Sequence, residues 1–532
     1  MIEQRRLVWI FAHTLVFFLS FPQILLGWSF DFGLGFVWLV PTTLLLVCKG
    51  TGWWKGALWA GLAGWLAHSL VFYWVYVAVV RYGGASPPLG VLSVVLLAVY
   101  GAFFSALLGA LAGLIKKEDL FSPLLFAAGW VVTDWLRSLF LTGFPWASLG
   151  YALHGDTWAR SLVAFSGVYG LSFLGVIGGF ALKFFFEGRF RLGVSYLLVV
   201  LFLHGVGFLL TEGDIRKVDS LKVGIVQGNI DQGVKWDPVR SERILQTYEK
   251  GTLEAIAKGA EIVLWPETAV PGIPEGDPAL LARIRGLAER TRTVLIVGAI
   301  GFEGERGLIV GSSSASRFFD SALLVNEDGF LVDRYDKAHL VPFGEYIPFR
   351  KFLGKFVSAS VAGVTATDVT SGSGPRVLRV SDLGPRGLLV GTPICYELLF
   401  PSLVRGFAKS GASFLTALTN DAWYGMTGAP RQFLAITTLR AIETGLWTVR
   451  AANTGISAFI APDGTIISEA DLFRREVLVE DIYLPEAFAS PTFYVRYGDV
   501  FVLVCAGFLL IFLFFVFKRG LSPGSKITSC SS

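Results

Sequence analysis

The stretch LLVGTPICYE, residues 388–397, leads from an apolar run through a cysteine into a helical pattern. Residues 387–390 are typical of a buried strand, and residues 398–409 are typical of a helix. Cys395 is therefore predicted to lie at a strand-to-helix turn. The other cysteines are Cys48, Cys505 and Cys530, so Cys395 has no disulfide partner between residues 214 and 498.

Strand and helix patterns alternate on both sides of this stretch. Runs typical of strands lie at 222–227, 261–265, 294–299, 322–325, 414–418 and 448–452, and helical patterns lie at 239–257, 278–290 and 430–444. This alternation predicts an α/β layer fold rather than an all-β sandwich. Because the sequence has no CxxC pair and no His/Cys cluster, neither a metal nor another cofactor is expected.

Two more motifs place polar residues at the ends of apolar strands. In Trp265-Pro266-Glu267 the proline ends ladder pairing, and the glutamate follows at the strand tip. In YDKAHLVPFGE, residues 335–345, Lys337 and Glu345 flank an apolar turn. A glutamate or lysine at a strand end is usually a solvated cap, so neither motif alone decides a function.

Glu267, Lys337 and Cys395 together suit nucleophilic catalysis. A thiol beside a cation and a helix N-terminus is expected to have a lowered pKa and to attack as a thiolate. A carboxylate in a dry pocket is expected to have a raised pKa and to act as a general base near neutral pH. The lysine and the backbone N–H after the cysteine can stabilise an oxyanion.

The first part of the chain has the composition of a membrane domain. Hydrophobic residues make up 53% of the whole chain and charged residues 16%, against about 25% charged in a typical soluble domain. Of 45 Lys and Arg and 41 Asp and Glu, residues 1–213 hold only 12 and 8. Apolar runs near spanning length lie at 7–27, 34–48, 55–80, 90–115, 121–142, 160–183, 192–211 and 501–517.

These runs predict a polytopic α-helical membrane domain with eight transmembrane helices. Seven belong to residues 1–213, a globular domain follows at 214–498, an eighth helix at 499–518, and a tail at 519–532. Twelve Lys and Arg flank one set of helix ends, and only Arg81, Arg137 and Arg160 flank the other. By the positive-inside rule both termini are predicted to be cytoplasmic, with the globular domain on the outer face. The net charge of +4 and the lack of a basic patch argue against a nucleic-acid partner.

A few polar side chains fall within the apolar runs. Asp134 and Arg137 share a helical face and are predicted to pair near the outer interface, although together with His68 they are also candidates to line a pathway. The stretch 143–146, GFPW, is predicted to belong to an interfacial aromatic belt.

The motifs at Glu267, Lys337 and Cys395 resemble, in the same order, the Glu/Lys/Cys signature of the nitrilase (carbon–nitrogen hydrolase) superfamily. That resemblance implies a nitrilase-like αββα sandwich for the globular domain. With the eight predicted spans, GFPW at 143–146 and NDAW at 420–423, nearly the whole chain resembles the apolipoprotein N-acyltransferases.

The resemblance also implies roles for individual residues. Cys395 matches the nucleophile, Glu267 the general base and Lys337 the oxyanion-stabilising residue. Supporting or substrate-binding roles are implied for Glu345, Tyr396, Glu397 and Trp236. Asp320 departs from the family, which usually has asparagine at this position.

The activity implied by the resemblance is transfer of an acyl chain from a phospholipid, typically phosphatidylethanolamine, by way of a cysteine thioester. The acceptor is the α-amine of the diacylglyceryl-modified N-terminal cysteine of an apolipoprotein, in the last step of lipoprotein maturation. The expected setting is a bacterial inner membrane, with a monomer in the lipid bilayer and its catalytic domain on the periplasmic face.

Two other functions stay open from the residues alone. One is a membrane-tethered amidase or nitrilase that uses water as its second nucleophile, and the other is a transporter or scaffold whose outer domain only binds. The segment after Glu345 bears on this choice, because Phe349, Phe352, Leu353 and Phe356 have the spacing of one helical face. With Arg350, Lys351 and Lys355 off that face, it is predicted to be a lipid-facing lid.

Overall fold

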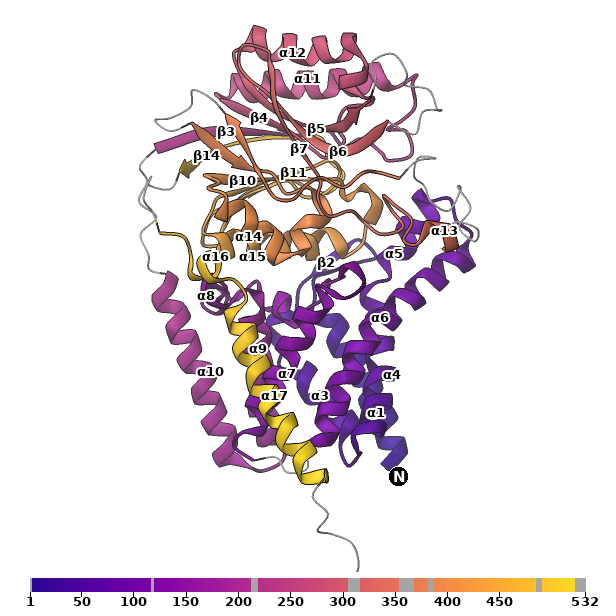
Figure 1. The fold of residues 1–532 in the computed structure, drawn as a ribbon, viewed down its shortest axis with the longest axis vertical. Helices are drawn as coiled ribbons and strands as arrows, with labels where there is room; N and C mark the ends of the chain where they lie inside the picture. The colour runs from indigo at the N-terminus through magenta and orange to yellow at the C-terminus, as the bar shows by residue number, and fades with distance from the viewer. Residues whose placement is uncertain are drawn as a thin grey trace, which may run out of the picture.

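The computed structural model describes residues 2–115, 119–211, 219–304, 316–353, 368–380, 387–484 and 490–521. A half built of helices lies below a half built of two sheets and their covering helices (Figure 1). The last helix, α17 (Val500–Leu521), returns from the sheets into the helical half.

The first sheet has six strands, and its order is β14-β3-β4-β5-β6-β7. Its central strands β3, β4 and β5 run parallel, and the other pairs are antiparallel. The bounds are β3 Asp219–Gln227, β4 Ile262–Trp265, β5 Val294–Glu303, β6 Arg317–Val325, β7 Leu331–Asp336 and β14 Glu476–Leu484.

The second sheet also has six strands, in the order β13-β12-β11-β10-β9-β8, with β9, β10 and β11 parallel. The bounds are β8 Val377–Val380, β9 Leu388–Gly391, β10 Phe414–Thr419, β11 Thr448–Ala452, β12 Ala458–Ile460 and β13 Ile466–Glu469. The strand predicted at residues 387–390 is therefore β9, which begins and ends one residue later.

The two sheets pack face to face between two layers of helices. Side chains alternate along β4: Ile262 and Leu264 point into the core between the sheets, while Val263 and Trp265 face the outer core. Helices α11 (Ser241–Ala257) and α12 (Pro278–Thr291) cover the outer sheet, and α14 (Pro401–Lys409) and α15 (Ala429–Thr444) lie between the second sheet and the helical half (Figure 1). The described part of the domain is thus an αββα sandwich, as expected.

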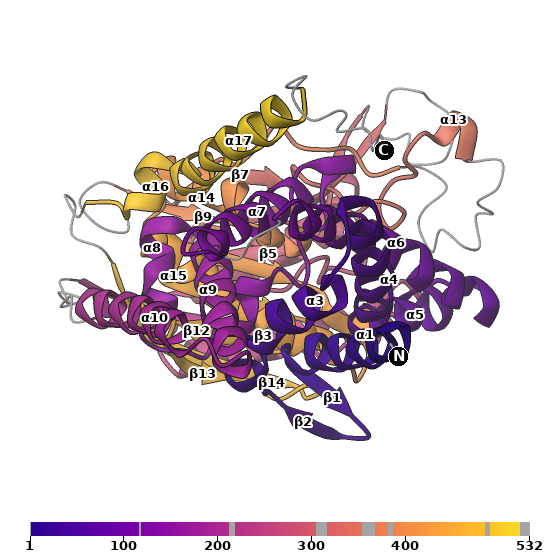
Figure 2. The same cartoon turned by 90° about the horizontal axis from the view of Figure 1, so that it is seen from below.

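The helical half contains a helix in each apolar run. Its helices are α1 Ile2–Leu19, α2 Gly33–Phe36, α3 Leu39–Cys48, α4 Trp53–Val71, α5 Trp74–Val77, α6 Pro87–Leu114, α7 Ser122–Arg137, α8 Val163–Ser166, α9 Val168–Phe186 and α10 Phe190–Thr211. A short hairpin of β1 (Gln23–Leu25) and β2 (Trp28–Phe30) projects from one side, and α10 and α17 lie at the periphery (Figure 2).

Among the described residues, three helices are long and apolar enough to span a membrane alone: α6, α9 and α10. Helix α4 and the segment Trp74–Tyr82, bent by 50° relative to each other, would add a fourth span if they form one. Leu39–Cys48 and Val500–Val516 are shorter apolar helices. A membrane domain is therefore supported, while the count of eight spans stays a prediction.

Helices α4 and α6 pack closely because small residues line their contact. An added Cβ at Gly109 would lie 2.3 Å from the Gly56 carbonyl oxygen and 2.4 Å from the Ala60 side chain. Small residues let helix backbones approach in this way inside a bilayer, where no hydrophobic effect drives helices together.

The basic residues segregate to the two ends of the helical half. At the end far from the sheets, the Lys49 and Lys183 ammonium groups lie 2.9 Å and 3.1 Å from the Glu187 carboxylate. At the end near the sheets, Arg160 lies 3.5 Å from the Thr465 hydroxyl, and Arg137 donates to the Trp146 carbonyl. These four members of the two sets counted in the sequence therefore lie at opposite ends.

Candidate active site

Cys395 follows β9 and starts a short 3-10 helix, Cys395–Leu399. Its backbone has a left-handed φ of 47°. Such a conformation is costly for a residue with a side chain and is found mostly where the surrounding structure enforces it, often at functional sites. Thr268 beside Glu267, with φ 46°, and Phe343 near Glu345, with φ 63°, are strained in the same way. Each of the three motifs thus contains a residue in an enforced backbone conformation.

The Lys337 side chain is fully buried among three carboxyl groups. Its Nζ lies 3.0 Å from Glu267 Oε1, 3.3 Å from Asp320 Oδ2 and 2.5 Å from Glu345 Oε1. Glu345 Oε2 accepts the Val341 N–H at 2.8 Å, which fixes that carboxylate. The acidic cluster of Glu267, Asp320 and Glu345 has the spacing of a metal site, but the lysine ammonium is the cation these groups contact.

Glu397 joins the cysteine turn to the lysine turn. Its Oε1 accepts the Tyr335 hydroxyl at 2.7 Å and the N–H groups of Ala338 and His339 at 2.7 Å and 3.1 Å. Its Oε2 accepts the Ile394 N–H at 2.7 Å. These bonds join the turn that contains Cys395 to the turn that contains Lys337. The contacts of Glu397 are therefore those of a positioning residue, and none of them is with the thiol.

The pKa directions at the site are opposite to those expected from the sequence. Burial, together with the charge of Glu267, raises the pKa of the Cys395 thiol well above its usual range, although Lys337 acts against this. Burial alone would raise the pKa of Glu267, but Lys337, Asp320 and Lys235 bring it below its usual value. These directions favour a protonated thiol and an ionised Glu267 in the resting site. A thiol in this state needs a base during attack.

Two family models match the chain. The model for carbon–nitrogen hydrolases covers residues 222–489, and the model for the apolipoprotein N-acyltransferase N-terminal domain covers residues 13–181. The apolipoprotein N-acyltransferase of Geobacter metallireducens is 33% identical, over 91% of this chain and 91% of its own. That of Brucella melitensis is 34% identical, over 88% of this chain and 85% of its own.

The chain belongs to the apolipoprotein N-acyltransferase family. Among solved structures, an amidase from Nesterenkonia is 20% identical and covers 52% of this chain and 92% of its own, with a TM-score of 0.37. Family membership rests on the relatives and on the two family models.

The stretch 143–146 lies at the junction of the two halves rather than in a lipid-facing belt. Trp146 is buried, with 1% exposure, and its Nε1 donates to Gln432 Oε1 of α15 at 2.7 Å. The Gly143 carbonyl accepts the Tyr396 hydroxyl at 2.8 Å. The predicted belt is therefore wrong for Trp146, because α15 covers it. Through its bond to Gly143, Tyr396, the residue after Cys395, joins the cysteine turn to the stretch 143–146.

Trp236 is half exposed and lies in the loop between β3 and α11, outside the carboxyl cluster. Its neighbour Lys235 was missed by the sequence analysis. Lys235 is 1% exposed, and its Nζ donates to the Glu267 carbonyl at 3.2 Å and to the Thr268 hydroxyl. Burial lowers the pKa of Lys235 to about 8. Its only signal in the sequence is its place beside Trp236, because burial of a loop lysine cannot be read from periodicity.

The predicted lid is described only in part. Helix α13 spans Arg350–Leu353, so Phe349, with a left-handed φ of 50°, precedes the helix instead of starting its apolar face. Phe349 is 77% exposed, and Arg350 Nε donates to Asp368 at 2.7 Å. The remainder of the segment, residues 354–367, lies outside the described residues.

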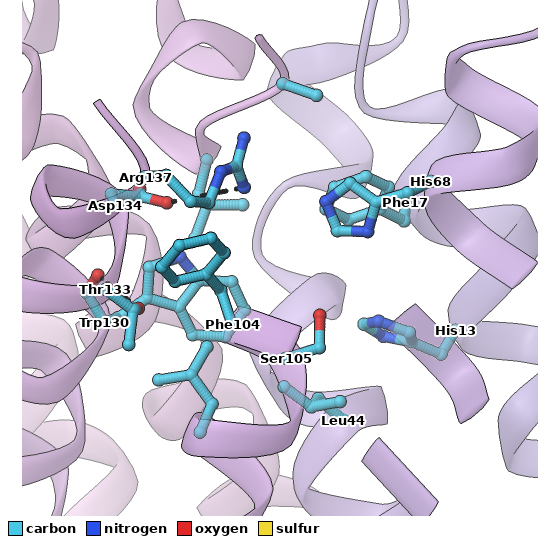
Figure 3. Close-up of a pocket in the computed structure, with 13 residues that line it drawn as sticks. His13, Phe17, Leu44, His68, Phe104, Ser105, Trp130, Thr133, Asp134 and Arg137 are labelled. Carbon is cyan, nitrogen blue, oxygen red and sulfur yellow. Dashed lines mark hydrogen bonds and ion pairs between the residues drawn. The ribbon is translucent and has the colours of Figure 1, made fainter. Parts of the chain in front are cut away.

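Asp134 and Arg137 pair in the helical half, as predicted, with 3.8 Å between Arg137 Nη1 and Asp134 Oδ1. They line one side of a pocket whose other side holds His13 and His68 (Figure 3). The Ser172 hydroxyl donates to Asp134 at 2.7 Å, and His68 Nδ1 lies 2.7 Å from the Gly64 carbonyl. The Ser172 contact ties Asp134 of α7 to α9, while His68 bonds within its own helix, and both suit a structural role for the pair.

Proposed function

We propose that this protein transfers an acyl chain from a phospholipid, through a thioester on Cys395, to the α-amine of a diacylglyceryl-modified apolipoprotein cysteine. The observation that carries the proposal is a buried thiol in an enforced turn, with Glu267 and Lys337 held next to each other in the same buried site. The family of the chain supports the choice of substrates.

In the first half-reaction, Glu267 takes the thiol proton as Cys395 Sγ attacks the sn-1 ester carbonyl of the phospholipid. The oxyanion that forms is stabilised by the Lys337 ammonium and by the backbone N–H of Tyr396, the residue after the nucleophile. When the intermediate collapses, the ester C–O bond breaks, and Glu267 returns its proton to the departing alkoxide. The products are a thioester on Cys395 and a lysophospholipid.

In the second half-reaction, the free α-amine of the lipoprotein attacks the thioester carbonyl. Glu267 accepts a proton from the attacking amine, an amide forms, and the C–S bond breaks. The Cys395 thiolate regains the proton from Glu267, so the site ends as it began. The same base and the same oxyanion contacts therefore serve both steps.

The helical half gives this chemistry access to lipids. Tyr396 contacts Gly143, and α15 packs on the segment that contains Trp146, so the site is fixed to the membrane domain rather than tethered to it. Both substrates would be lipid-anchored, and the distribution of basic residues supports a site at the outer face of a bacterial inner membrane.

The orientation can be tested by labelling introduced cysteines with a membrane-impermeant maleimide. Ala257→Cys lies on the exposed side of α11, and Lys55→Cys lies at the exposed start of α4. Intact spheroplasts should label Ala257→Cys, and only lysed ones should label Lys55→Cys. The reverse pattern would place the catalytic half in the cytoplasm.

The function is tested by supplying purified protein with phospholipid labelled on its sn-1 chain and a diacylglyceryl peptide with a free α-amine. The expected products are triacylated peptide and an equal amount of lysophospholipid, with no product from an N-acetylated control peptide. Release of free fatty acid without peptide acylation would favour the amidase-like alternative, in which water is the acceptor. Binding of both lipids without turnover would favour the scaffold.

A further inference from the structure

Among the described carboxyl groups around Lys337, Asp320 is the one with a fully buried oxygen that no donor reaches. Its Oδ2 lies 3.3 Å from Lys337 Nζ, but its Oδ1 is buried and, within the described structure, accepts no hydrogen bond. The residue is 4% exposed, in the middle of β6, where it pairs with Ile300 of β5. A buried carboxylate oxygen without a donor carries a large desolvation penalty.

One carboxyl oxygen each of Asp320, Glu267 and Glu345 lie within 4.8 Å of one another in this buried site. Two ionised carboxylates this close repel each other, and neither can donate to the other, so a proton on Asp320 or Glu267 would relieve the pair. Glu267 also faces Lys337 at 3.0 Å, with Lys235 bound to its backbone carbonyl. The two cations therefore favour ionisation of Glu267, and the proton belongs on the other member of the pair.

We propose that Asp320 is a neutral carboxylic acid that donates its Oδ1 proton to Glu267 and thereby positions the general base. The role of Glu267 as a base rests on the proposed function, whereas the protonation of Asp320 is a property of the resting protein. Asp320 is a positioning residue, because it acts through Glu267 and Lys337. A neutral carboxyl group offers one donor and one acceptor, as the side-chain amide of asparagine offers donors and an acceptor.

The charges around Asp320 agree with a neutral group. The titratable groups that face it are Glu267, Glu345, Lys337 and Lys235. With Asp320 neutral, two carboxylates balance two ammonium groups. With Asp320 ionised, a third negative charge would be buried beside the other two. Burial and the charge of Glu267 accordingly raise the pKa of Asp320 well above its usual range.

The protonation state can be measured without turnover by infrared difference spectroscopy at pH 7. The wild-type minus Asp320→Asn spectrum should contain one carboxylic-acid C=O stretch that shifts on exchange into D₂O. Glu267→Gln and Glu345→Gln serve as matched controls. If the band survives in Asp320→Asn and disappears in either control, the proton lies on another carboxyl group and the proposal is wrong. The absence of any such band would also overturn it.

A kinetic comparison tests the positioning role. Asp320→Asn keeps a donor and should retain most of the acyl-transfer rate, whereas Asp320→Leu, of similar bulk but without a donor, should lose about tenfold or more. Wild type should also lose activity at high pH, as Asp320 ionises, earlier than Asp320→Asn does. Equal losses in both variants would contradict the role. The infrared result stands apart from the acyl-transfer assay, so failure of the proposed function and failure of this inference are distinguishable.

Discussion

Two buried cations of the catalytic half, Arg450 in β11 and Lys337 after β7, have different surroundings. Arg450 of β11 faces one carboxylate: its Nη2 lies 2.9 Å and 3.1 Å from the two oxygens of Asp421, and its Nη1 donates to the Ile456 carbonyl at 2.6 Å. Lys337 faces three carboxyl groups. The first site is balanced in charge, while the second has more acid than base.

This difference separates a structural ion pair from a site that can move protons. In the balanced pair, every change of protonation leaves a buried charge without a counter-ion, so the pair is fixed. In the Lys337 cluster a proton can pass among the carboxyl groups and the Cys395 thiol while the ammonium stays charged. The comparison therefore predicts that changes at Lys337 affect rate and that changes at Arg450 affect stability.

The largest effect is expected for Lys337→Met. Loss of an oxyanion-stabilising group typically costs about 100- to 1,000-fold in turnover, and here it also removes the counter-ion of Glu267. Single-turnover acylation with labelled phospholipid would measure this. Retention of more than a tenth of the wild-type rate would contradict the assigned role.

Arg450→Met is the matched change at the balanced site. Leaving Asp421 buried without its partner should lower the free energy of unfolding by about 3–5 kcal/mol, as seen in denaturation of the detergent-solubilised protein. The double variant Arg450→Met with Asp421→Leu should recover much of this loss. If Arg450→Met instead stays stable and inactive, the contrast between the sites fails.

Glu267→Gln should reduce turnover by about 100-fold or more, because the amide cannot accept the thiol proton. Wild-type activity should fall at acid pH as Glu267 becomes protonated. Lys337 keeps the pKa of Glu267 below its usual value, so this loss should come only well below neutral pH. A pH–rate profile of the acylation step would show it. A variant with an unchanged acid limb would exclude Glu267 as the base.

Glu397→Gln should change the pH dependence of stability. Burial, acting against several hydrogen-bond donors, raises the pKa of Glu397 from 4.5 to about 7. Between pH 4.5 and about 7, Glu397 stays protonated in the folded chain but is ionised in the unfolded chain. Its contribution to the free energy of unfolding therefore falls as the pH rises over this range. The variant should have a lower Tm but a flatter dependence over that range. Glu289→Gln, at an exposed position, is the control and should leave the slope unchanged.

The smallest effect is expected for Phe349→Ser. Phe349 is exposed and follows Glu345 closely in the chain, and contact with lipid would make its loss cost about three- to tenfold in acylation from vesicles. Phe330→Ser, at the turn between β6 and β7, is the matched exposed control. Equal losses from vesicles and from detergent-dispersed phospholipid would argue against a lipid contact.

The sequence predicted the positions of Glu267 and Cys395 because each follows a short apolar run with a clear stop, whereas Lys337 follows the polar strand LVDRYD and was found by its motif. The αββα arrangement followed from the resemblance, and the elements 261–265 and 448–452 match β4 and β11. Strands β7, β8, β12, β13 and β14 were not predicted. Strands β8, β12 and β13 are short, the IISE of β13 is mostly exposed, and charged residues interrupt β7 and β14.

The pKa directions could not be predicted from the motifs. They depend on Lys235, Asp320 and Glu345, which are distant in the sequence and meet only in the folded site. The burial of Trp146 could not be predicted for the same reason. An aromatic residue after an apolar run has the same local sequence pattern whether it faces lipid or lies under α15. The number of spans stays a prediction, because α3 has only 10 residues and α7 only 16, and composition alone does not say whether such helices cross a bilayer.

The central claim is that the acyl chain is carried by Cys395. Purified protein would be incubated with phospholipid labelled on its sn-1 chain and no acceptor, then digested and examined by mass spectrometry. The account predicts an acyl group on the Cys395 peptide that neutral hydroxylamine releases, that moves to a diacylglyceryl peptide when one is added, and that is absent from Cys395→Ser. Acylation of a different residue, or acyl transfer by Cys395→Ser at the wild-type rate, would contradict it.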